Sequence, residues 1–127
     1  MIDSDLSSAF YVIRAFAPKM IEKKSGCIIN VASIWGELGA SCESHYAAAK
    51  AGMIALSRSL DQELSPSGIR VKYIAPGAVE TDMLSGYSKE DREFIEAELG
   101  KIKSPAQIAQ EILDLVSLGG IEPPIRL

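Results

Sequence analysis

Tyr46 and Lys50, in the stretch Tyr46-Ala-Ala-Ala-Lys50, are the residues of this chain whose types and spacing suit proton transfer. Positions four apart lie on one face of a helix, so the Lys50 ammonium can approach the Tyr46 phenol. An ammonium beside a phenol favours the phenolate form, and such a phenol can act as a general acid or base. Ser33, which ends an apolar run, can donate a hydrogen bond to a carbonyl or alkoxide oxygen. Together these side chains predict proton transfer to or from an oxygen atom.

The elements around these residues predict a parallel βαβ unit. Residues 27–33 are nearly all apolar and β-branched, which is typical of a strand buried on both faces of a parallel sheet. A loop over 34–44 and an alanine-rich helix over 46–64 follow, and Asp61 of that helix is expected to face water. The next apolar strand, over 69–75, completes a right-handed crossover unit. Ser33 then lies at the carboxyl end of the sheet, where α/β proteins bind ligands.

Three further helices are expected outside this unit, over residues 6–24, 88–99 and 105–118. Residues 3–5 are good N-cap types for the first helix. The second is short and acidic and is expected to lie on a mobile lid. The last begins at Ser104-Pro105 and ends at Gly119-Gly120. The order of elements predicts an α/β fold in one domain over residues 1–127.

Composition and charge argue against several classes of protein. The chain has 127 residues with 13 Lys+Arg, 17 Asp+Glu, a net charge of −4 and 47% hydrophobic residues. This acidic balance argues against nucleic acid as a partner, and no apolar stretch reaches the roughly 20 residues of a membrane span. Cys27 and Cys42 form no CxxC motif, so neither a disulfide framework nor a metal site is expected. The N-terminus lacks a basic secretory leader, and we therefore expect a cytoplasmic protein.

Several motifs resemble, in order and spacing, those of the short-chain dehydrogenases/reductases. The run Tyr46-Ala-Ala-Ala-Lys50-Ala-Gly resembles the family's catalytic helix, and it follows Asn30-Val-Ala-Ser33 by 13 residues, counted from Ser33 to Tyr46. The run Ile74-Ala-Pro-Gly-Ala-Val-Glu-Thr-Asp-Met83 resembles the family's nicotinamide loop. Within the family, the chain is similar to the bacterial 3-oxoacyl-acyl-carrier-protein reductases.

This resemblance implies a function and a set of site residues. It implies reduction of a small-molecule carbonyl, or oxidation of an alcohol, with NAD or NADP as cofactor. Tyr46 would exchange the proton, Lys50 would tune Tyr46 and bind the nicotinamide ribose, and Ser33 would polarise the carbonyl. The implied catalytic residues are Ser33, Tyr46, Lys50 and Asp5, and the implied cofactor-binding residues are Tyr46, Lys50, Pro76, Gly77, Val79 and Thr81. Two long helices commonly pair between subunits in this family, so a homo-oligomer is also implied.

The chain departs from the family pattern at three points. Asp5 stands where a catalytic Asn is usual, and Lys72 stands where an Asn is common in the second strand. No TGxxxGxG or NNAG-like segment occurs, although these motifs belong to the half that binds the adenosine and pyrophosphate of the cofactor. The resemblance therefore implies a partial Rossmann-like three-layer sandwich of two parallel strands and flanking helices. Residues 1–127 would form a truncated domain, the catalytic half without the N-terminal βαβ half.

Two functions remain open from the sequence. The first is an oxidoreductase of this family, which the Ser-Tyr-Lys set favours. The second is a non-catalytic truncated relative that acts as an assembly or pseudoenzyme module, which the missing half and the two substitutions favour. A YxxxK spacing alone is weak evidence, because such pairs often form an ordinary amphipathic surface. Trp35 fits a substrate pocket and a packed core equally well. His45 is interpreted as a side chain of a loop or of the substrate pocket, and the acids of residues 90–98 are interpreted as a solvated helix face.

Overall fold

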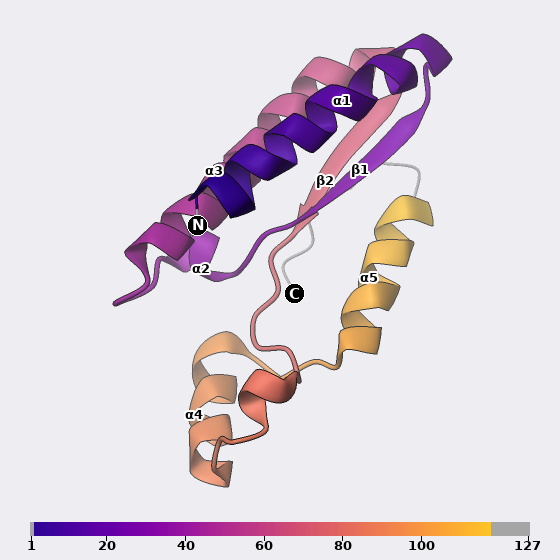
Figure 1. Cartoon of the computed structure of the whole chain (residues 1–127). Coiled ribbons are helices and arrows are strands. Elements are labelled where there is room, and N and C mark those ends of the chain that lie inside the picture. The colour runs from indigo at the N-terminus through magenta and orange to yellow at the C-terminus, as the bar shows by residue number, and fades with distance from the viewer. Residues whose placement is uncertain (1, 118–127) are drawn as a thin grey trace.

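The computed structural model describes residues 2–117, and Figure 1 shows how their helices and strands follow one another. In chain order the elements are η1 (Asp3–Ser7), α1 (Ser8–Lys23), β1 (Gly26–Val31), α2 (Trp35–Leu38), α3 (Ser44–Leu64), η2 (Ser65–Ser67), β2 (Ile69–Ile74), η3 (Asp82–Leu84), α4 (Lys89–Leu99) and α5 (Pro105–Ser117). The two strands are parallel and flanked by helices, so the predicted α/β fold is confirmed.

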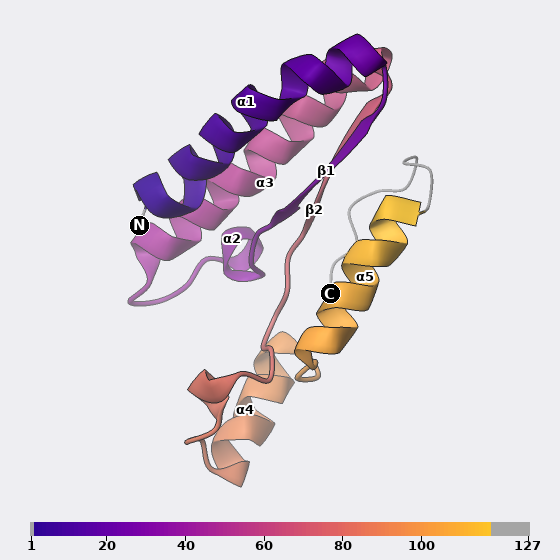
Figure 2. The ribbon, with the colours of Figure 1, turned by 45° about the vertical axis from the view of Figure 1, so that its right-hand side comes forward.

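Three layers are built around the two strands. β1 and β2 pair in parallel along their full length, and α3 forms the crossover between them. The long helices α1 and α3 lie side by side next to the strands, and α5 lies on the other side of the strands (Figure 1 and Figure 2). Arg70 of β2 ties α5 to the sheet, because its guanidinium donates to the carbonyl oxygens of Leu115 at 3.4 Å and Val116 at 3.0 Å. The predicted three-layer arrangement is therefore observed.

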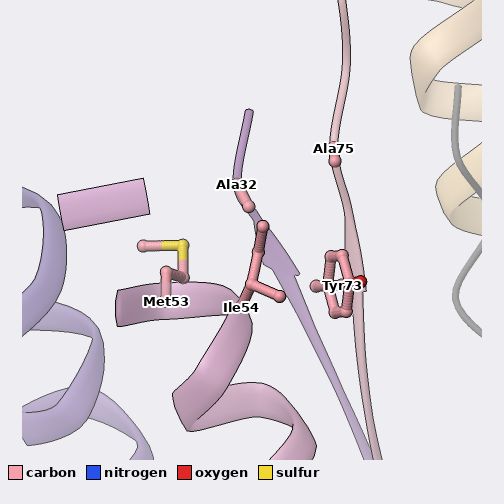
Figure 3. Packing of buried hydrophobic residues seen from close by; sticks show 5 residues of the cluster. All are labelled: Ala32, Met53, Ile54, Tyr73 and Ala75. Carbon is pink, nitrogen blue, oxygen red and sulfur yellow. The ribbon is translucent and has the colours of Figure 1, made fainter. Parts of the chain in front are cut away.

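The hydrophobic core lies between α3 and the sheet. Figure 3 shows its central cluster, which is formed by Ala32, Met53, Ile54, Tyr73 and Ala75. A buried polar pair joins the same two layers: Asn30 Nδ2 donates to Ser57 Oγ at 2.8 Å, and Ser57 Oγ donates to the Met53 carbonyl oxygen at 2.8 Å. Buried polar groups are costly unless they are hydrogen-bonded, so the bond between Asn30 and Ser57 favours one position of α3 over β1.

The two outer edges of the sheet differ. The Ala32 N–H donates to the Ile74 carbonyl at 2.8 Å, so the alternation of a parallel ladder directs the N–H and C=O of Val31 away from β2. No strand pairs with that edge within residues 2–117. On the β2 edge, the Val71 N–H donates to Asp61 Oδ1 at 2.8 Å. Asp61 is thus half-buried at the sheet, and the prediction that it faces water is wrong because a backbone donor without a strand partner recruits it.

β1 is less buried than its apolar sequence predicts. Its first four residues are half-buried and Val31 is 46% exposed, although burial on both faces was expected. Burial alternates along most of β2, as in a strand with one well-covered face. The reason is that α3 packs mainly on β2, so the faces of β1 have less helix over them and its outer edge has no strand within residues 2–117.

Some element boundaries differ from the prediction. Residues 3–5, expected to cap the first helix, lie inside the π-helical turn η1, because Ile2 already has helical backbone angles (φ −58°, ψ −43°). The loop expected over 34–44 contains the short helix α2. α4 begins close to the predicted start, and the structure adds a capping box between Ser88 and Asp91. The predicted end of α5 at Gly119-Gly120 lies outside the described residues. None of the helices described is long and apolar enough to cross a membrane.

Candidate active site

Ser33 lies just beyond the carboxyl end of β1 and is buried, with 7% of its surface exposed. Its Oγ accepts a hydrogen bond from the Trp35 N–H at 3.2 Å, and its carbonyl oxygen accepts one from the Gly36 N–H at 2.9 Å. These bonds start α2 and fix the serine backbone. A hydroxyl that accepts one bond retains its own proton, so Ser33 can still donate to a ligand oxygen.

Tyr46 and Lys50 lie one turn apart on α3, as their spacing predicts. Lys50 Nζ is 5.6 Å from the centre of the Tyr46 ring and donates to the Val31 carbonyl oxygen at 3.1 Å. This carbonyl belongs to the outer edge of β1, so the sheet edge anchors the ammonium beside the phenol. Gly36 lets α2 approach α3 here, because a Cβ at that position would lie 2.7 Å from the Lys50 carbonyl carbon.

A cleft brings the serine and the tyrosine together. One part, of about 580 Å³, is lined by Ser33, Trp35, Glu43, Tyr46, Gly77, Met83 and Tyr87. An adjoining part, of about 490 Å³, shares five of these residues and is also lined by Ala78, Val79, Thr81, Leu84, Ile95 and Leu99. Elements far apart in sequence therefore form one space, with the Tyr46 side of α3 facing the loop that follows β2.

The loop after β2 forms the wall opposite α3. The buried Pro76 accepts the Ile34 N–H at 3.0 Å through its carbonyl oxygen, which joins the two loops at the carboxyl end of the sheet. A parallel bridge pairs Val79 with Lys103, and we call residues 82–102, which lie between them, the lid. In this bridge the Lys103 N–H donates to the Ala78 carbonyl at 3.1 Å, and the Glu80 N–H donates to the Lys103 carbonyl at 2.8 Å. The bridge leaves the N–H and C=O of Val79 itself unused.

The lid helix α4 is tied to this loop by an arginine. Arg92 donates to both carboxylate oxygens of Glu80, at 2.6 and 2.8 Å, and to the Leu84 carbonyl oxygen at 2.9 Å. The hydrogen bond from Arg92 holds the pKa of Glu80 below its ordinary value. Hydrogen bonds from Ser88 likewise lower the pKa of Asp91, an acid that caps α4. The carboxylates of Glu80 and Asp91 are therefore both held in hydrogen bonds, to Arg92 and to Ser88.

Asp5 is not brought to the cleft. It lies half-buried in η1, where Asp5 Oδ1 accepts a hydrogen bond from Ser4 Oγ at 3.3 Å, and it lines neither part of the cleft described above. Its neighbour Leu6 packs against Gly52 of α3, where a Cβ would come within 2.6 Å of the leucine side chain. η1, which contains Asp5, therefore packs against α3, but Asp5 does not line the cleft with Ser33 and Tyr46.

Three residues that line the part of the cleft with Ser33 were not singled out as site residues from the sequence. Glu43 directly precedes α3, while Met83 and Tyr87 lie between β2 and α4 and are 85% and 49% exposed. Large apolar side chains in a polar segment were the signal available for the last two. Of the two interpretations of Trp35, the structure supports a cleft wall, whereas His45 is exposed and lines neither part.

The chain is similar to known proteins over most of its length. The family model described as short chain dehydrogenase matches residues 1–92. YmfI of Bacillus subtilis (strain 168), an uncharacterized oxidoreductase, is 41% identical over 119 residues, which cover 92% of this chain and 49% of that protein. The 3-oxoacyl-[acyl-carrier-protein] reductase of Chlamydia muridarum (strain MoPn / Nigg) is 40% identical, with 92% of this chain and 48% of that protein covered.

A solved structure shares the fold. The crystal structure of the 3-oxoacyl-[acyl-carrier protein] reductase from Brucella melitensis ATCC 23457 matches with a TM-score of 0.77 at 33% identity. The match covers 87% of this chain and 42% of that structure. The chain thus spans about half the length of the curated relatives it matches.

Proposed function

Since the chain belongs to the short-chain dehydrogenase family, we propose that it carries the proton-transfer site of an NAD(P)-dependent oxidoreductase acting on a small-molecule carbonyl or alcohol. One observation supports this most strongly: Ser33 and Tyr46 line the same cleft at the carboxyl end of the sheet. Residues 1–127 are then the catalytic half of the domain. The shared cleft favours this function over the non-catalytic assembly module.

In the proposed reaction, protein side chains handle the proton and the substrate oxygen. In reduction, Tyr46 gives its phenolic proton to the carbonyl oxygen, and in oxidation it takes that proton back from the alcohol. Ser33 donates a hydrogen bond to the same oxygen. The Lys50 ammonium, anchored by the Val31 carbonyl, stabilises the phenolate left after the transfer. A bound reduced nicotinamide would supply the hydride.

The cleft fits the nicotinamide end of such a cofactor. A carboxamide needs a hydrogen-bond acceptor and a donor, and Val79 has a backbone N–H and C=O outside the bridge to Lys103. Thr81 adds an exposed hydroxyl on the same wall, which Gly77 also lines, whereas the buried Pro76 lines neither part of the cleft. The adenosine and pyrophosphate would need residues that this sequence does not contain, because it has no glycine-rich phosphate motif.

Cofactor binding and a tyrosine variant test this function. We expect titration with NADH and NADPH, followed by nicotinamide fluorescence, to show saturable binding to the full chain. Tyr46→Phe should lower carbonyl reduction by about 10²–10⁴-fold, because it removes the acid–base group. Gln62→Ala, an exposed position on α3 that lines neither part of the cleft, is the control and should retain activity. The proposal is wrong if millimolar cofactor does not bind, or if reduction survives Tyr46→Phe.

We also propose that a second copy of the chain packs on α1. The apolar residues of α1 that are exposed are Phe10, Tyr11, Val12, Phe16 and Ile21. Neighbouring exposed apolar side chains of this size are typical of protein–protein interaction surfaces. Sedimentation should show a dimer or larger oligomer, and Phe16→Glu should shift it toward the monomer.

A further inference from the structure

We propose that the substrate is a neutral, largely apolar carbonyl compound or its alcohol, and that the cleft disfavours carboxylates. This inference rests on the proposed function in one respect: it takes the cleft beside Ser33 and Tyr46 as the substrate site. It adds the chemical class of the substrate, which the Ser-Tyr-Lys set does not determine. The walls of the cleft and the charges around it carry the inference.

The walls beside the proton-transfer residues are apolar and partly uncovered. Trp35, Met83 and Tyr87 line the part of the cleft that also contains Ser33. Met83 is 85% exposed and Tyr87 is 49% exposed, so a ligand that covers them removes apolar surface from water. The adjoining part continues this surface with Leu84, Ile95 and Leu99 of the lid. A ligand with an apolar chain or ring therefore gains affinity from both parts.

The charge around the cleft disfavours anions. Among the described residues that line its two parts, Glu43 is the only Asp, Glu, Lys or Arg. A substrate carboxylate would lie near this acid with no cation in the walls to offset the repulsion. Basic residues of the lid helix are paired with acids: Arg92 with Glu80 at 2.6 Å, and Lys89 with Glu93 at 3.7 Å.

The positive charge of Lys50 does not offset this repulsion of carboxylates. Its ammonium is bonded to the Val31 carbonyl oxygen at 3.1 Å and lies 5.6 Å from the centre of the Tyr46 ring. It lines neither part of the cleft described here. In the proposed reaction its charge supports the Tyr46 phenolate, so it is not a binding group for a distant carboxylate.

Trp35 provides a direct probe of this site, because it is the single tryptophan of the chain and lines both parts of the cleft. Its fluorescence reports ligand binding without cofactor and without hydride transfer. The test compares methyl 7-oxooctanoate with 7-oxooctanoate on the full chain at low ionic strength. The two ligands share the ketone and the chain, and they differ in the charge at one end.

We expect the ester to bind at least about tenfold more tightly than the carboxylate, because the carboxylate must be desolvated beside an acid. Glu43→Gln should tighten carboxylate binding by about threefold, the size of a screened charge repulsion, and leave the ester unchanged. Glu63→Gln is the matched control. It removes an exposed acid at the other end of α3, about 30 Å from Glu43, and should change the affinity for neither ligand.

Three results would overturn the proposal. The carboxylate could bind as tightly as the ester or more tightly, Glu43→Gln could leave the ratio of the two affinities unchanged, or the Trp35 fluorescence could show no saturable change with the ester. Failure of the proposed function is a separate result. If the ester binds but cofactor does not, the function fails and the inference about the cleft stands. If carbonyls are reduced without a preference for neutral ligands, the function stands and the inference fails.

Discussion

Asp61 is predicted to stabilise the fold by closing the outer edge of β2. One carboxylate oxygen accepts the Val71 N–H at 2.8 Å, and the other accepts the Lys72 ammonium, also at 2.8 Å. The Lys72 side chain is only 11% exposed, and the Asp61 side chain is 30% exposed. Asp61→Ala would therefore leave a buried backbone donor and a mostly buried cation without their acceptor. Asp61→Asn would keep an oxygen for Val71 and remove only the ion pair.

The sizes of these effects follow from what each variant leaves behind. A buried donor without an acceptor costs about 1–3 kcal/mol. A mostly buried lysine without its partner adds a further penalty, reduced here because solvent reaches the pair through Asp61. We expect Asp61→Ala to lower the free energy of unfolding by about 2–4 kcal/mol and Asp61→Asn by about 1–2 kcal/mol. Asp61→Ala combined with Lys72→Met should recover about 1 kcal/mol, because the second change removes the unpaired charge.

Urea unfolding followed by circular dichroism measures all of these variants. Glu63→Ala, an exposed position on the same helix, is the control and should change stability by less than about 0.5 kcal/mol. The reasoning is refuted if Asp61→Ala is no more destabilising than this control. It is also refuted if the double variant is less stable than Asp61→Ala alone.

Other contacts give three further predictions. Gly36→Ala would place a Cβ 2.7 Å from the backbone of α3, so the free energy of unfolding measured in urea should fall by about 1–3 kcal/mol. An unchanged urea midpoint would contradict this prediction. Ser57→Ala leaves the buried Asn30 amide without its acceptor and should cost about 1–3 kcal/mol in the same assay, whereas a cost below that of a surface change would argue against the pair. Glu80 has a lowered pKa, so its bond to Arg92 stabilises the lid above the unfolded pKa and is lost as the pH falls through the lower folded value. Lid amides should therefore exchange hydrogen with less protection below about pH 4. Glu80→Gln should reduce this pH dependence and leave the part that belongs to the capping acid Asp91, and a pH dependence of unchanged size would contradict the role of Glu80.

The architecture could be predicted because its signals are local. The apolar runs over 27–33 and 69–75 lie within two residues of β1 and β2, and the crossover between parallel strands admits few arrangements. The family was also correctly predicted, since its motifs are short and ordered along the chain. The spacing of Tyr46 and Lys50 placed both on one face of α3. Their roles in catalysis, like that of Ser33, stay predictions.

What the sequence did not predict depends on tertiary structure. Asp61 looked like a solvated helical residue, because nothing local shows that its carboxylate meets the unpaired N–H of Val71. β1 is less buried than its apolar composition predicts, because composition does not reveal that α3 packs mainly on β2. Met83 and Tyr87 could not be assigned to the cleft, since their position depends on how the lid returns over the loop after β2.

Because the two sheet edges differ, a further strand could pair more readily with β1 than with β2. Asp61 occupies the Val71 donor on one side, so a further strand meets a charged obstacle there. On the other side, Val31 offers a carbonyl whose partner is a side chain, Lys50. A strand added beside β1 that bonded to this oxygen would have to share it with the ammonium or compete with it, since the oxygen has two lone pairs. The position of the Lys50 ammonium and the outer edge of the sheet are thereby linked through one carbonyl oxygen.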